Sequence, residues 1–214
     1  MLEVSEIFKS YRKKEVLSGV SFQAAPGECV GIVGGNGCGK TTLLAILAGA
    51  RKADRGSLKA DGQEILGRPA LQAAKIAYVP QENPFMEELS VKDNLSLWYK
   101  GDRAAIKRDL ENGPAAMLGV SDFLRVPVGK LSGGMKKRLS IASALAGQER
   151  ILIMDEPGAA LDLVCKEVIR EYLREYLKKG GTVLLSSHEM DELAVCTRLL
   201  VLKGGKVPEA PAGL

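Results

Sequence analysis

The sequence predicts an α/β fold with a parallel sheet core, an N-terminal antiparallel β subdomain and a helical subdomain inserted at about 83–135. Two early β patterns separated by a charged turn are typical of antiparallel strands. Strand and helix patterns then alternate, which indicates a parallel sheet with helices on its faces. Between 83 and 130 this alternation gives way to helical stretches with no strand pattern, which indicates an insertion.

Composition limits the classes of protein to consider. The 214 residues fit one domain over 1–214, and 46% hydrophobic with 26% charged residues is typical of soluble globular chains. A formal net charge of +4 and only 5% aromatic residues do not indicate a nucleic-acid partner. The charged N-terminus, the absence of an apolar run near ~18 residues and four cysteines without metal-site spacing predict a cytoplasmic protein with reduced, buried cysteines.

The first half of the chain contains short β segments and one clear helix. Strands are predicted at 2–8, 16–22, 29–33 and 76–79. The glycine-free apolar stretch 40–48 is predicted to be a helix that ends before Gly49. The Asp61-Gly62 pair, between two short β patterns, is typical of a two-residue hairpin turn.

The second half begins with the helical insertion and then returns to alternating strands and helices. Predicted helices lie at 91–99, 103–110 and 139–145 and after Asp162 and His188; predicted strands lie at 151–154, 182–186 and 199–202. In the helix after Asp162, apolar pairs alternate with charged pairs every four residues, so one side is apolar. A coiled coil would follow a seven-residue repeat, so we expect this helix to cover the sheet instead.

A phosphate-binding loop is the most specific local pattern. Gly34-Gly35-Asn36-Gly37-Cys38-Gly39-Lys40-Thr41 matches GxxxxGK[ST] between a buried strand and a helix, a context that disfavours a chance match. Glycines let backbone N–H groups surround a phosphate, and the helix N-terminus adds its positive dipole end. We expect Lys40 to reach the β- and γ-phosphates and the Thr41 hydroxyl to bind Mg²⁺. The loop residues predicted to bind the nucleotide are Gly34, Gly35, Asn36, Gly37, Cys38, Gly39, Lys40, Thr41 and Thr42.

A second acidic element follows the apolar strand 151–154. The run ends in Asp155, as in a strand that is buried on both faces and stops at a polar site. Asp155 is predicted to support the metal, and Glu156 to act as general base on an attacking water. The alternative is that these acidic residues only mark an ordinary transition from a strand to a loop. The presence of the phosphate-binding loop disfavours this alternative.

Together with Leu131-Ser132-Gly133-Gly134-Met135, these motifs resemble the ATP-binding cassette (ABC) ATPases, and the resemblance runs from about Leu2 to Val207. It implies a RecA-like phosphate-loop NTPase core that binds ATP and Mg²⁺. It also implies that Ser132, Gly133, Gly134 and Met135 form a signature site that closes on the γ-phosphate of a second, head-to-tail subunit. Met135 departs from the glutamine usual in the family, but the contacts implied for Ser132 and Gly134 do not need that side chain.

Other positions are implied by the same resemblance. Gln81 resembles the glutamine that links the metal to the helical insertion, and His188 the histidine that contacts the γ-phosphate. Ala160-Leu161-Asp162 resembles the loop that crosses the dimer, with Ala159 where serine or glycine is common. Tyr11 resembles the aromatic residue on which adenine stacks, although it could simply pack against the sheet.

The resemblance implies the ATPase subunit of a transporter. The LSGGM-KKR form is closer to bacterial exporter cassettes, and the partners would be a second ATPase subunit, identical or homologous, and separate transmembrane permease chains. The protein would lie peripherally on the inner face of the cell membrane. Candidate docking residues of the insertion are Phe85, Met86, Leu97 and Trp98, which could equally pack its own core. The alternatives are a soluble ABC ATPase, for example in cofactor assembly, and a different phosphate-loop kinase, which the signature motif disfavours.

Overall fold

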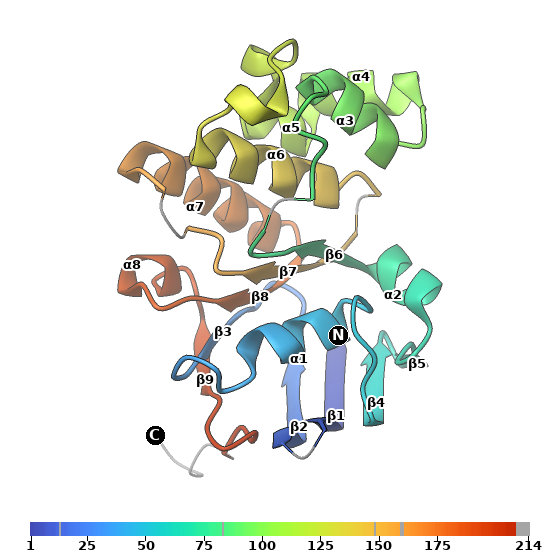
Figure 1. Cartoon of the computed structure of the whole chain (residues 1–214), viewed down its shortest axis with the longest axis vertical. Helices are drawn as coiled ribbons and strands as arrows, with labels where there is room; N and C mark the ends of the chain where they lie inside the picture. Colours follow the sequence, from blue (N-terminus) through green and yellow to red (C-terminus); the bar gives the residue numbers. More distant parts are fainter. Residues whose placement is uncertain (13, 83, 148, 159–160, 209–214) are drawn as a thin grey trace.

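The computed structural model describes residues 1–12, 14–82, 84–147, 149–158 and 161–208. Two sheets organise these residues (Figure 1). One is antiparallel with the strand order β2-β1-β4-β5, and the other has the order β6-β7-β8-β3-β9 with every neighbouring pair parallel. The predicted α/β class, with a parallel core and an N-terminal antiparallel part, is therefore confirmed.

The antiparallel sheet comes from the N-terminal part of the chain. Its strands are β1 (Leu2–Tyr11), β2 (Lys14–Ala24), β4 (Arg55–Ala60) and β5 (Gln63–Glu64). β1 and β2 exceed their predicted ranges because their polar ends continue the pairing, with Tyr11 opposite Lys14, where both side chains are exposed. The predicted hairpin is present: Asp61 and Gly62 both have positive φ, 51° and 77°, which suits a primed two-residue turn.

The parallel sheet is buried between two apolar clusters. Its strands are β3 (Cys29–Val33), β6 (Ile76–Val79), β7 (Ile151–Asp155), β8 (Thr182–Ser186) and β9 (Arg198–Val201). Alternate residues of β7 point to opposite faces, so Ile151 and Ile153 join one cluster while Leu152 and Met154 join the other. This explains the uninterrupted apolar run in the sequence, since neither face of the strand meets water.

Helices cover the two faces of the parallel sheet. α1 (Lys40–Leu47) packs on β7 and β8 from one side, and α6 (Gly133–Ala144) and α7 (Leu163–Lys178) pack from the other (Figure 1). The apolar side of α7 covers the sheet through Ile169, Tyr172 and Leu173, as its four-residue repeat predicts. The short α8 (Met190–Leu193) precedes β9.

The chain between β6 and β7 forms helices joined by loops, with no named strand among its described residues. It contains α3 (Val91–Trp98), α4 (Arg103–Asn112), α5 (Pro114–Met117), the 3-10 helices η1 (Val120–Phe123) and η2 (Val128–Lys130), and then α6. This part extends beyond α6 at one end of the molecule (Figure 1). None of the described helices is both long enough and apolar enough to cross a membrane.

Two helices differ from the sequence predictions. α6 begins at Gly133 rather than at 139, because Ser132 caps it with a hydrogen bond from Met135 N to Ser132 Oγ (3.2 Å) that offsets the two glycines of its first turn. α2 (Pro69–Lys75) was not predicted, since its only buried residue is the polar Gln72 and the segment has no apolar stripe.

Candidate functional site

The phosphate-binding loop is packed on its inner side and open on its outer side. Gly39, the N-cap of α1, has a φ of 112°, and a Cβ there would lie 3.2 Å from the Val16 carbonyl oxygen. Gly35 and Gly37 are exposed, and a Cβ on either would meet nothing within 4 Å. Free backbone groups at the N-terminus of α1 thus face solvent, the arrangement that binds anions.

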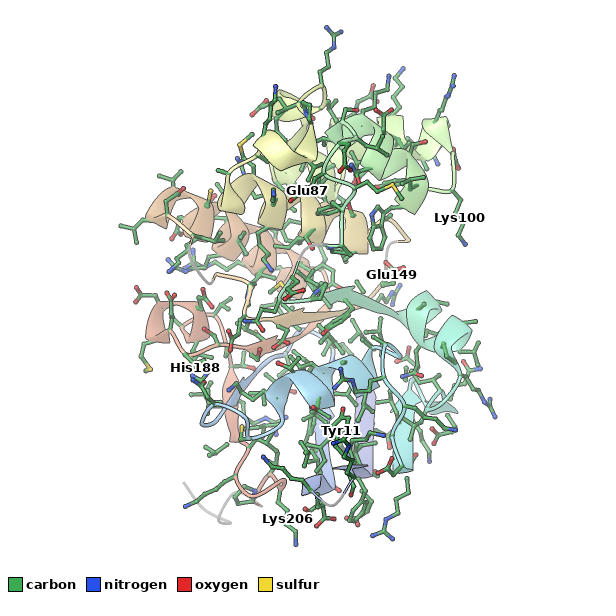
Figure 2. All side chains as sticks on the ribbon, in the orientation of Figure 1. Tyr11, Glu87, Lys100, Glu149, His188 and Lys206 are labelled. Atoms are coloured by element: carbon green, nitrogen blue, oxygen red, sulfur yellow. The ribbon has the colours of Figure 1, made fainter. Side chains whose placement is uncertain are left out.

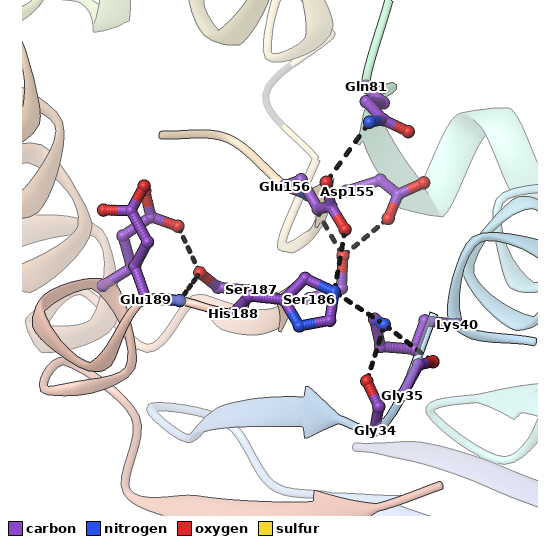
Figure 3. A network of polar contacts seen from close by, with 11 residues as sticks. Gly34, Gly35, Lys40, Gln81, Asp155, Glu156, Ser186, Ser187, His188 and Glu189 are labelled. Carbon is purple, nitrogen blue, oxygen red and sulfur yellow. Dashed lines mark hydrogen bonds and ion pairs between the residues drawn. The ribbon is translucent and has the colours of Figure 1, made fainter. Parts of the chain in front are cut away.

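Lys40 belongs to a polar network that also contains His188 (Figure 3). Its side chain is only 6% exposed, and its Nζ donates to Gly34 O at 2.9 Å and lies 3.1 Å from His188 Nε2. His188 stands beside the loop that precedes α1 (Figure 2). The single histidine is therefore brought next to the lysine of the phosphate-binding loop by a contact that spans 148 positions of sequence.

Glu156 connects His188 to Gln81. His188 Nε2 lies 3.3 Å from Glu156 Oε1, and Gln81 Nε2 donates to Glu156 Oε2 at 3.2 Å. One ring nitrogen faces both Lys40 and Glu156, so a proton on Nε2 serves Glu156 and a bare Nε2 accepts from Lys40. Lys40, His188, Glu156 and Gln81 thereby form a continuous chain of polar contacts at the carboxyl ends of the parallel strands (Figure 3).

The end of β7 holds Asp155 and Glu156 in different environments. Asp155 is fully buried, and Ser186 Oγ donates to its Oδ1 at 2.6 Å. Glu156 has a positive φ of 47°, and its backbone N–H donates to Ser186 O at 3.1 Å. This left-handed conformation is costly for a residue with a side chain, and the bond to β8 fixes it. It lets Asp155 face inward while Glu156 reaches the polar network.

The predicted metal-binding residues come from three separate elements. Thr41 lies in α1, Gln81 follows β6, and Asp155 ends β7. Among the described residues, no group of three or more His, Cys, Asp or Glu could hold a metal ion. Asp155 Oδ2, however, is buried without a partner in the described part of the chain, which suits a nearby cation. A hydroxyl, an amide and a carboxylate also supply the oxygen donors that Mg²⁺ prefers, with water and substrate phosphates completing its shell.

Tyr11 lies over the antiparallel sheet (Figure 2). Its ring is 39% exposed, its hydroxyl accepts a hydrogen bond from Arg51, and Lys9 and Arg51 lie over the ring at 5.4 and 5.5 Å from its centroid. An exposed ring is available for stacking, but these cations are its present neighbours. Adenine stacking on Tyr11 remains a prediction.

The signature residues form the first turn of α6. Ser132 is exposed at the N-cap, Gly133 is exposed and Met135 packs partly against the helical core. Gly134 is buried against α7, where a Cβ would lie 2.3 Å from Cys165 Sγ. Glycine is therefore required there by close packing, while the free N–H groups of the helix start stay open to an anion.

The predicted dimer loop is only partly described. Ala159 and Ala160 lie outside the described residues. Asp162 caps α7 by accepting a hydrogen bond from Cys165 N at 2.8 Å, which lowers the pKa of its carboxyl. A role of Asp162 at a dimer interface stays a prediction.

Sequence reasoning missed several polar residues around the site. Ser186 holds Asp155, while Ser187 Oγ donates to Glu192 Oε2 at 2.6 Å. Lys137 of α6 is buried, and its Nζ donates to Pro80 O at 3.1 Å. Burial lowers the pKa of Lys137 and raises that of Glu192. The Ser-Ser pair at a strand end was a usable signal, whereas Lys137 resembled an ordinary basic residue of an exposed helix.

Comparisons with known proteins agree on the family. Residues 17–159 match the family model described as ABC transporter. The chain is 38% identical to Nod factor export ATP-binding protein I of Paraburkholderia xenovorans and 36% identical to that of Rhizobium etli. These alignments cover 100% and 96% of this chain but 72% and 66% of the relatives, so the chain spans about two thirds of their length.

Solved structures give the same result for the fold. A dimeric, post-hydrolysis state of an ATP-binding cassette bound to ADP and Pi superposes with a TM-score of 0.87 at 27% identity and 100% coverage of both chains. A nucleotide-free cassette of an ABC transporter gives 0.87 at 26% identity, with 97% and 89% coverage. With the phosphate-binding loop, the acidic end of β7 and the signature turn in place, the chain belongs to the ABC transporter family as an ATP-binding ATPase subunit.

Proposed function

We propose that this ATPase forms a head-to-tail dimer on ATP and drives a separate transmembrane subunit that exports its substrate. The observation that carries the proposal is the contact chain from Lys40 through His188 and Glu156 to Gln81. It gathers a phosphate-binding cation, a histidine and a carboxylate base where the open loop faces solvent. Export is supported by the names of the relatives, which are export ATP-binding proteins.

Hydrolysis requires a bound phosphate chain and an activated water. The loop N–H groups and the Lys40 ammonium group bind the β- and γ-phosphates, because Lys40 is already held beside the loop by Gly34. Glu156 accepts a proton from the attacking water, and His188 contacts the γ-phosphate. Thr41, Gln81 and Asp155 would hold Mg²⁺, which neutralises developing phosphate charge when bound.

The second subunit would complete each ATP site. Ser132 and the exposed start of α6 form a second anion-binding helix terminus, on the opposite side of the sheet from α1 (Figure 1). A head-to-tail dimer places this terminus against the nucleotide of its partner and gives two equivalent sites. The similar cassette that was solved as a dimer bound to ADP and Pi supports dimerisation.

The helical part would dock on the permease. Met86, Leu97 and Trp98 are exposed by 56%, 55% and 41%, and Phe85 meets Trp98 edge-on with centroids 6.5 Å apart. Exposed large apolar side chains that lie together indicate a contact surface. Docking there would keep the protein, which we propose is one domain with an inserted helical subdomain, on the cytoplasmic face of the membrane.

The Glu156→Gln variant tests the dimer and the base together. The amide keeps the size of the side chain but cannot take a proton, so ATP-Mg should accumulate in a stable dimer, seen as a doubled mass in light scattering after gel filtration. The Glu156→Gln/Lys40→Ala double variant should stay monomeric, and Glu88→Gln, an exposed control, should behave as wild type. A Glu156→Gln variant that stays monomeric with ATP-Mg contradicts the composite site.

Purification of the same variant from detergent-solubilised membranes tests the transporter role. A co-purifying multi-spanning chain supports transport. A soluble partner favours the alternative of a soluble ABC ATPase and leaves the ATPase assignment of the wild-type chain unchanged.

A further inference from the structure

Lys137 is a buried lysine whose ammonium group bonds to backbone carbonyls. Its side chain is 4% exposed, and its Nζ donates to Pro80 O at 3.1 Å and to Gln81 O at 3.4 Å. Removing an ammonium group from water is costly, so these bonds must offset that cost. The partners are 57 and 56 positions away in sequence, so the contact joins two distant segments.

The segment held by Lys137 carries Gln81. It leaves β6 at Val79, and Pro80 has no N–H with which to anchor it. The Gln81 side chain is exposed and donates to Glu156 Oε2 at 3.2 Å. The main-chain carbonyl of Gln81 is thus held by Lys137, while its side-chain amide bonds to the proposed base, Glu156.

The same lysine belongs to the helix that carries the signature. Ser132 caps α6, and Lys137 follows five residues later, which corresponds to about 7.5 Å along the helix axis at 1.5 Å per residue. Over so short a length an α-helix moves as a rigid body. A shift at Ser132 therefore moves Lys137 and the carbonyls bonded to it.

We propose that Lys137 is a positioning residue that holds Gln81, and through it Glu156, in a fixed relation to the signature end of α6. The proposal rests on the function proposed above, because it uses the roles of Gln81, Glu156 and Ser132. Contact of Ser132 with a γ-phosphate is thereby transmitted to the base through one helix, one ammonium group and one amide side chain.

Lys136, the neighbouring residue, provides the matched control. It also reaches the segment after β6, but through an ion pair with Glu87 at 2.8 Å in which the Glu87 side chain is 65% exposed. Exposed ion pairs contribute little, so loss of this one removes a charge from α6 without freeing Gln81.

The test compares Lys137→Met, Lys137→Arg and Lys136→Met in steady-state ATP hydrolysis. Lys137→Met keeps the length of the side chain and removes its donors, so kcat should fall about tenfold while KM for ATP changes less than about twofold. Lys137→Arg keeps donors and should recover at least about half of the lost activity on a logarithmic scale. Lys136→Met should stay within about twofold of wild type. Thermal unfolding of each variant shows whether a loss of kcat merely follows a loss of stability.

A double-mutant cycle with Gln81→Ala then identifies the route. If Lys137 acts through Gln81, Lys137→Met has little further effect on kcat once Gln81 is removed. Additive losses, a kcat loss that follows stability, or an unchanged kcat in Lys137→Met overturn the proposal. An unchanged kcat in Gln81→Ala would instead contradict the function proposed for the site. If Lys137→Met does not fold, Lys137→Gln, which keeps a shorter donor, takes its place in the same cycle.

Discussion

At the scale of single residues, the affinity of Lys40 for phosphate depends on a difference in free energy. The contacts that its ammonium group makes with phosphate must be more favourable than those it makes within the protein. Its ammonium group bonds to Gly34 O and lies beside His188 Nε2. Phosphate oxygens compete for the same hydrogens, and charged acceptors form stronger hydrogen bonds than neutral ones. Binding therefore exchanges the neutral Gly34 carbonyl for anionic oxygens within a loop that already holds the lysine in place.

Lys40→Ala should reduce ATP affinity by about 100-fold or more, because it removes the buried cation that we propose binds the phosphates. Isothermal titration calorimetry measures the dissociation constant directly. Lys107→Ala, which removes an exposed lysine of α4, serves as the charge-matched control. Wild-type affinity in Lys40→Ala would contradict the phosphate-loop assignment.

The residues of the site differ in how far the sequence alone predicts their roles. Gly34 to Thr41 follow a local spacing, so the chain itself brings them together and the motif predicts their arrangement. Lys137 and Ser186 act on residues 57 and 31 positions away, respectively. Only the folded sheet sets those contacts, and neither residue type is distinctive on its own.

At the scale of elements, the start of α6 combines two roles in Ser132. Its hydroxyl accepts from Met135 N and so caps the helix, and its exposure makes the same terminus available to a phosphate. The two roles respond differently to a negative charge, since aspartate is a good N-cap but repels an anion.

Ser132→Ala and Ser132→Asp separate these roles. Ser132→Ala should lower the free energy of unfolding by about 1 kcal/mol through the lost cap. Ser132→Asp should keep wild-type stability but lose ATP-dependent dimerisation in a Glu156→Gln background. Thermal unfolding and light scattering measure the two effects, and dimerisation of the Ser132→Asp protein would argue against a phosphate site at this terminus.

Sequence patterns predicted the elements with an apolar pattern better than those without one. α7 has a four-residue repeat and β7 has an uninterrupted apolar run, so their existence and packing were predictable. α2 and α5 bury a single residue each, Gln72 and Ala115, and such short helices owe their conformation to neighbouring chain segments. The first turn of α6 was missed because its glycines disfavour helix in isolation.

At the scale of the whole molecule, a half-buried carboxyl group lies among the helices between β6 and β7. Asp109 of α4 accepts a hydrogen bond from the Tyr99 hydroxyl, and burial raises the pKa of Asp109. Burial likewise raises the pKa of Glu149, at the entrance to β7. A carboxyl with a raised pKa favours the folded state when protonated, so its contribution is complete below the ordinary pKa and is lost as pH rises through the raised value.

The free energy of unfolding should therefore contain a part that declines as pH rises above 3.8, the ordinary pKa of the Asp109 carboxyl, and Asp109→Asn should make that decline smaller. Urea titrations across this range measure the slope. Asp122→Asn, on the exposed side of η1, is the control for loss of a surface charge. A steeper decline in Asp109→Asn would show that Asp109 does not act in this way.

The order of strands in the parallel sheet also determines when, during synthesis, each strand can pair with its neighbours. β3 leads into the phosphate-binding loop, yet its two neighbours are β8 and β9, which leave the ribosome more than a hundred residues later. Until then β3 has two unpaired edges, which are prone to wrong pairing and attractive to chaperones. The nucleotide site is thus completed late although its loop is translated early, since a nascent chain that ends before β8 lacks both the neighbouring strands of β3 and His188.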